Sequence, residues 1–193
     1  PPMAAAATGR RLLADSRLRG VLVGYALFAF TWQATAGFLP TFLPASKSFS
    51  PAVAHAGVGA LFVVGALVKP AAGSLGDRVP RELVAPAALT LGALAMGGLV
   101  LAQTPLVATV AVVVFAVGLM SYPPVMQARL MDLFPEESAG GDLGAMRTVY
   151  IGVGSLGPTY VGVVADYWSY TVAFATLVGC LALAAVLVGV FGR

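Results

Sequence analysis

The stretch that decides the fold is a short charged turn: Gly73-Ser74-Leu75-Gly76-Asp77-Arg78-Val79-Pro80-Arg81. Long apolar runs flank it on both sides, from about residue 53 to 72 and from about 83 to 102. A run of about 20 apolar residues is long enough to cross a hydrocarbon core of about 30 Å as a helix. The pattern therefore predicts a tight, charged connection between two membrane-spanning helices.

Composition places the whole chain in the same class. Of its 193 residues, 59% are hydrophobic and only 10% are charged, whereas a soluble domain carries roughly 25% charged residues. A soluble helical protein would need polar faces at helical spacing, and the third and sixth apolar runs have none. We predict an all-α polytopic membrane protein, with a linker at 1–18 and a bundle at 19–193. Its six spans are expected at about 20–43, 52–75, 83–103, 105–128, 144–165 and 168–191.

The basic residues predict the orientation of the spans. Nine of the eleven basic residues fall before, between or after the spans, or at their ends, on one side of the predicted membrane. Of the other two, Lys47 lies in a loop on the opposite side, and Lys69 lies inside a span. Because positive charge accumulates in cytoplasmic loops, both termini should be cytoplasmic in a multi-pass protein of the cell membrane. This placement argues against nucleic acid as a partner. The nine residues that share one side are Arg10, Arg11, Arg17, Arg19, Arg78, Arg81, Arg129, Arg147 and Arg193.

Polar residues sort the spans by environment, since a polar group inside a bilayer needs a cavity or another helix. The first and fourth spans carry most of them and are expected to line a cavity, whereas the third and sixth should face lipid. Two groups of three spans suggest a 3+3 inverted repeat. Pro40 and Pro44 are expected to break the end of the first span. The substrate-binding candidates in or beside the cavity are Tyr25, Trp32, Gln33, Lys69, Tyr122 and Tyr150.

The fifth span carries a stripe of small residues and a proline. Its members are Gly154, Gly157, Pro158 and Gly162. Small residues let helix backbones approach closely, and an interior proline removes a helical hydrogen bond. Two interpretations stay open, a moving helix hinge and plain tight packing. The lone Cys180 offers no disulfide, and no cofactor or metal site is expected.

The turn resembles a family signature. Gly73-x-Leu75-x-Asp77-Arg78-x-Pro80-Arg81-Glu82 is similar to the G-x-L-x-D-R/K-x-G-R-R/K motif of the major facilitator superfamily, which joins the second and third helices of each six-helix half. The fifth-span stripe, followed by Asp166, resembles that family's fifth or eleventh helix. The resemblance covers about residues 10–192 and is closest to the C-terminal half. It implies half of a transporter fold, with an N-terminal six-helix half missing from this sequence.

The resemblance implies a gating role for the turn. Gly73 is expected to permit close helix contact, and Asp77 to accept hydrogen bonds at a neighbouring helix start. Arg78 and Arg81 are expected to pair with carboxylates across the same face, with Asp132 as the preferred partner. A topology-setting basic loop without a switching role is the alternative. The chain departs from the family at Pro80, where glycine is usual, and at Glu82, where a base is usual, so the latch is expected to be weaker or differently arranged.

Lys69 is a charged residue inside the second span. It lies eight residues before Asp77, or roughly 12 Å along a helix, and its stem could snorkel toward the interface. Lys69-Pro70-x-x-Gly73 also resembles the Arg-Pro-x-x-Gly of the family's monocarboxylate porters, whose arginine handles the carboxylate. Gly65 stands where those porters have an aspartate, so that proton-coupling pair is not carried over. Substrate contact and snorkelling both stay open.

These observations predict a secondary active transporter of a small solute that works by alternating access. Its partners would be a small-molecule substrate, with an organic anion as one candidate, a coupling ion (proton or sodium), the lipid bilayer and the other half. A drug or metabolite efflux antiporter of the same superfamily is an alternative, and a non-transporting membrane scaffold or sensor is another. An enzyme is not expected, because no nucleophile and base lie within reach of one another among the spans. A channel would show a repeated pore loop or a charged ring, and the sequence has neither.

Overall fold

The structure is a computed structural model that describes residues 14–192; Arg10 and Arg11, with the rest of 1–13, and Arg193 lie outside the described residues. The described part contains helices and connecting turns, with no strand. The predicted all-α fold with six long apolar helices is confirmed. The 3+3 repeat stays a prediction. The helices are α2 (Ser16–Lys47), α3 (Pro51–Arg78), α4 (Arg81–Leu101), α5 (Pro105–Leu133), α6 (Ala139–Gly154), α7 (Leu156–Tyr167) and α8 (Tyr170–Phe191).

The first helix differs from the sequence expectation at both ends. It begins at Ser16, inside the range expected to be a linker, and it continues through Pro40 and Pro44, where breaks were expected, to Lys47. A proline removes one helical hydrogen bond, but unsatisfied backbone groups are costly in an apolar medium. The remaining bonds therefore hold α2 in one piece. The helix ends at Ser48, which adopts a left-handed conformation with φ 56°.

Side-chain caps define the starts of three other helices. Ser50, Thr104 and Ser169 precede α3, α5 and α8, and each side chain accepts a hydrogen bond from the backbone N–H three residues later. Such caps satisfy a donor that a helix start leaves without an intrahelical partner. The chain thus marks where these spans begin with short polar residues.

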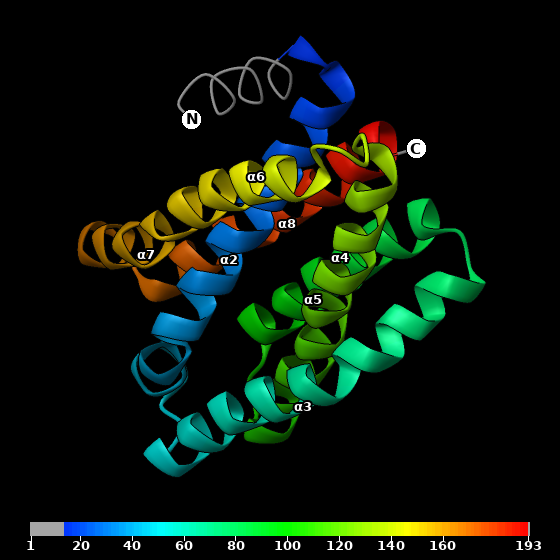
Figure 1. The fold of residues 1–193 in the computed structure, drawn as a ribbon. Coiled ribbons are helices and arrows are strands. Elements are labelled where there is room, and N and C mark those ends of the chain that lie inside the picture. Colours follow the sequence, from blue (N-terminus) through cyan, green and yellow to red (C-terminus); the bar gives the residue numbers. More distant parts are fainter. Residues whose placement is uncertain (1–13, 193) are drawn as a thin grey trace.

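The helices pack in a continuous bundle (Figure 1). Helix α5 packs against both α3 and α4, α8 packs against both α4 and α2, and α6 and α7 pack along α2. The approach of α4 to α5 depends on Gly118, where a Cβ atom would lie 2.5 Å from the Gly92 nitrogen and 2.9 Å from the Ala88 oxygen. Two helices cross here with their backbones almost in contact, as small residues permit within membranes.

Contacts between segments distant in the sequence show which turns lie at each end of the bundle. The start of α2 and the end of α8 lie together (Figure 1), with Gly20 against Phe191. Arg129 near the end of α5 donates to the Gly192 oxygen, and the turn at Arg81 lies beside the end of α5. At the opposite end, the Lys47 ammonium donates to the Val100 oxygen. The turns after Lys47 and after Arg78 therefore lie at opposite ends. Which end faces the cytoplasm stays a prediction.

We expect Gly118→Ala to lower the free energy of unfolding by about 1–3 kcal/mol, because the added methyl group overpacks the α4–α5 crossing. Unfolding in detergent, followed by circular dichroism, measures this change. Gly97→Ala in α4 is the control, since a Cβ atom there would meet nothing within 4 Å, and alanine favours the helix. Equal effects of the two substitutions would contradict the close crossing.

Candidate functional site

The charged turn is organised around Arg81, the first residue of α4. Its Nη2 donates to Asp77 Oδ1 at 3.0 Å and its Nε to the Gly76 oxygen at 3.2 Å, both at the end of α3. Its Nη1 donates to Asp132 Oδ2 near the end of α5. One guanidinium thus joins three helix ends. Its planar fork of five donors suits this role.

Two residues of the predicted gating motif lie differently from the expectation. Arg78 is exposed and pairs with no carboxylate among the described residues; it is the last residue of α3 and stands outside the Arg81 network. A Cβ atom at Gly73 would meet nothing within 4 Å, so the expected close contact at Gly73 is not made by the described chain. Gly76 makes it instead, because it is buried and its Cβ would lie 3.3 Å from Val125.

Three of the predicted substrate-binding residues meet in an aromatic cluster. The Tyr25 ring of α2 stacks on the Tyr150 ring of α6 with centroids 4.0 Å apart, and lies 5.0 Å from the Tyr122 ring of α5. Gln127 Nε2 donates to the Tyr25 hydroxyl at 3.2 Å. The Tyr122 hydroxyl is buried and has no hydrogen-bond partner in the described part of the chain. The cluster ties α2, α5 and α6 together in a largely buried position.

Trp32 and Lys69 meet in a second place, a pocket of about 220 Å³ between α2, α3 and α5. The Trp32 ring stands edge-on to Phe62, with centroids 5.6 Å apart. The pocket is lined by Trp32, Leu61, Phe62, Gly65, Ala66, Lys69 and Met120. Gly65 lets α3 approach α5, because a Cβ atom there would lie 2.7 Å from Met120 Cγ. The predicted Gln33 is half-buried and does not line this pocket.

The small-residue stripe packs against α2. A Cβ atom at Gly157 would lie 2.3 Å from the Phe30 oxygen, and one at Gly154 would lie 3.0 Å from Ala29 Cβ. A Cβ atom at Gly162 would lie 3.6 Å from the Phe38 ring. The span is interrupted between α6 and α7, at Ser155. Pro158 lacks the N–H that would bond to the Gly154 oxygen, which accounts for the interruption. Tight packing is thus present, and motion at this point stays a prediction.

The fold and these sites define a multi-pass α-helical membrane protein with a mostly apolar core and a charged turn between α3 and α4. Residues 21–193 match the sequence profile of the Major Facilitator Superfamily, and the chain belongs to this family. It is therefore a membrane transporter protein of that superfamily, whose members act on small-molecule substrates and are transporters rather than enzymes. Comparison with curated proteins gives no match for the chain.

Sequence reasoning did not place three residues of these sites. Gln127 is visible as a polar residue of the fourth span, and its amide is a hydrogen-bond partner that Tyr25 requires. Phe62 and Met120 carry no sequence signal, because an apolar residue in an apolar span looks the same whether it faces lipid, another helix or a pocket. Only the packing of α3 on α5 brings these two to Lys69.

We expect Arg81→Gln and Asp132→Asn to show a coupling energy of about 0.2–1 kcal/mol in a double-mutant cycle of unfolding, because both partners are partly exposed. The Asp132 side chain is 57% exposed and the Arg81 side chain 24%. Thermal unfolding of the four variants in detergent provides the values. Arg78→Gln paired with Asp132→Asn is the control, and it should show no coupling.

Proposed function

We propose that this chain forms one half of a secondary active transporter that carries a small organic anion by alternating access. The proposal is carried by one observation, the pocket in which Lys69 is the only charged residue and the remaining lining is aromatic or aliphatic. A single cation beside an apolar wall matches a carboxylate with an apolar body.

The position of Lys69 supports a contact with the substrate. A charged residue inside a span is costly unless it pairs with another charge, faces a water-filled cavity or snorkels to the interface. Lys69 forms no ion pair with a carboxylate in the part of the chain that the structure describes. An anion in the pocket would provide the missing counter-charge, and it would be attracted strongly because the surroundings are apolar.

The walls of the pocket favour a compact substrate with an apolar body. Trp32 and Phe62 present two rings edge to face, with an interplanar angle of 75°, and hydrophobic and aromatic side chains form most of the lining of such sites. At about 220 Å³, the pocket of this half is smaller than the roughly 300–1,000 Å³ of a complete ligand site. The second half of the carrier would therefore supply the opposite wall.

The exposed helix faces support that second half. Helix α3 leaves most of its surface uncovered, and Phe62, Val63 and Leu67 are 52%, 60% and 71% exposed. Phe62 also lines the Lys69 pocket, so the uncovered face borders that pocket. The whole carrier would lie in the cell membrane with both termini cytoplasmic, and a proton or sodium gradient would drive it.

The Arg81 network would serve as a latch in this cycle. It joins the end of α3, the start of α4 and the end of α5 through exposed carboxylates. Ion pairs of this kind contribute little stability individually and can be broken and remade at low cost. A conformational change that separates α5 from the α3–α4 turn would open the Arg81–Asp132 pair first.

We expect Lys69→Gln to raise the half-saturation concentration for a transported carboxylate about tenfold to a hundredfold. This corresponds to the loss of about 1.5–3 kcal/mol for a hydrogen bond to a charged group. Uptake by the full-length carrier in proteoliposomes measures it, and Lys69→Arg should recover most of the affinity.

The substrate class is tested with three matched probes of one apolar body: benzoate, benzyl alcohol and benzylamine. Benzoate should compete with uptake of the transported carboxylate far better than the other two. Equal competition by all three, or unchanged affinity in Lys69→Gln, would count against an anion site. Vesicles that bind carboxylates without any uptake would indicate the scaffold or sensor alternative.

We expect Asp77→Asn and Asp132→Asn each to slow the maximal uptake rate while leaving membrane insertion and substrate affinity intact, because both weaken the latch and neither lines the Lys69 pocket. Exchanging the charges of the Arg81–Asp132 pair should restore part of the rate. Unchanged uptake in both single variants would remove the latch from the mechanism and leave a turn that only sets topology.

A further inference from the structure

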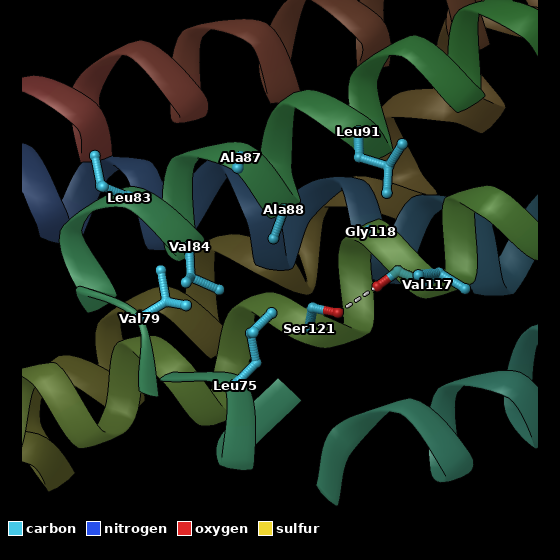
Figure 2. Close-up of a pocket in the computed structure, with 10 residues that line it drawn as sticks. All are labelled: Leu75, Val79, Leu83, Val84, Ala87, Ala88, Leu91, Val117, Gly118 and Ser121. Carbon is cyan, nitrogen blue, oxygen red and sulfur yellow. Dashed lines mark hydrogen bonds between the residues drawn. The ribbon is translucent and has the colours of Figure 1, made fainter. Parts of the chain in front are cut away.

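An apolar groove lies on the side of the bundle where α3 turns into α4 (Figure 2). It has a volume of about 420 Å³. Helix α4 forms one wall, the end of α3 the other, and α5 lies between them. Figure 2 shows Leu75, Val79 and Val84 gathered near the turn, and Leu91 and Val117 at the other end. The lining residues are Leu75, Val79, Leu83, Val84, Ala87, Ala88, Leu91, Val117, Gly118 and Ser121.

The groove offers nothing to a polar solute. Its one polar side chain, Ser121, donates its hydroxyl to the Val117 oxygen at 2.6 Å within its own helix (Figure 2). The other lining residues are apolar. Leu75 and Leu83 are 48% and 58% exposed, so the groove opens outward and is not filled by the bundle. An occupant must therefore be a hydrocarbon chain or an apolar helix face.

The groove continues into a polar cleft at the charged turn. Val79 lines both the groove and the cleft, whose volume is about 550 Å³. The cleft is lined by Gly76, Asp77, Arg78, Val79, Pro80, Arg81, Glu82, Arg129 and Asp132. A molecule that fits both parts has an apolar tail and a polar or charged head. This amphiphilic shape is that of a phospholipid rather than a helix face.

The charged residues of the cleft determine which kind of lipid headgroup fits it. Asp77 and Asp132 both pair with Arg81, and Arg129 donates to the backbone at Gly192. Arg78 pairs with no carboxylate among the described residues, so its guanidinium is available at the junction. Glu82 lies in the first turn of α4, where the positive end of the helix dipole partly neutralises it.

From this arrangement we infer that the groove and cleft form a binding site for an anionic phospholipid, with an acyl chain along α4 and α5 and the phosphate on Arg78. The predicted cytoplasmic position of the turn places the site in the leaflet that carries anionic lipids. The bound lipid would lie beside the Arg81 latch without competing for its carboxylates. The inference does not depend on the substrate of the carrier.

The test uses purified full-length protein in detergent with an equimolar mixture of phosphatidylglycerol and phosphatidylcholine of identical acyl chains. Native mass spectrometry counts the lipids retained. Arg78→Gln probes the head and Ala87→Phe fills the groove, with Leu83→Phe as a second filling variant. Arg17→Gln and Ala182→Phe are matched controls, because both residues are exposed and lie outside the groove.

We expect the wild-type protein to retain phosphatidylglycerol about fivefold over phosphatidylcholine, which corresponds to about 1 kcal/mol for one basic residue near a lipid surface. Arg78→Gln should abolish this preference, both filling variants should reduce retention of the two lipids, and the controls should match the wild type. Lack of preference in the wild-type protein, equal loss in Arg17→Gln, or unchanged retention in the filling variants would overturn the inference. So would a photoreactive residue at position 87 that captures a polypeptide instead of lipid.

Discussion

The exclusion of charge from the hydrocarbon core is the constraint on which the rest of this structure depends. Ions lose their hydration inside a bilayer, so the chain confines nearly all its charged groups to the ends of six long helices. The few polar groups between those ends must meet one another or border a cavity. The hydrogen bond from Gln127 to Tyr25 and the position of Lys69 beside a pocket both follow from this requirement.

Close packing then decides which of these groups meet. Without a hydrophobic driving force between helices in lipid, contact depends on how closely their backbones can approach. Gly118 brings α5 onto α4, Gly65 brings α3 onto α5, and Gly157 brings α7 onto α2. Each of these approaches borders a proposed functional feature: the lipid groove, the Lys69 pocket and the interrupted fifth span. Small residues thus set the shape of the cavities whose chemistry other residues provide.

The α3–α4 turn links two proposed functions in one short segment. Arg81 holds the turn against α5, and its neighbour Arg78 stays outside that network. A latch that shares its surroundings with a lipid site would respond to the composition of the membrane. Two arginines three residues apart have different roles because Arg78 is the last residue of α3, whereas Arg81 is the first residue of α4.

The sequence by itself determined the membrane class, the six apolar helices and the family, because these depend on composition and length along one dimension. It also named Arg81, Asp132, Trp32 and Lys69. Only the tertiary structure decided that Arg81 rather than Arg78 meets Asp132, that Gly76 rather than Gly73 is packed, and that Pro40 and Pro44 lie within a continuous helix. The physical reason is that these contacts depend on how each helix is rotated about its axis and how closely it approaches its neighbours. In an apolar span, the sequence does not show which face a neighbouring helix covers.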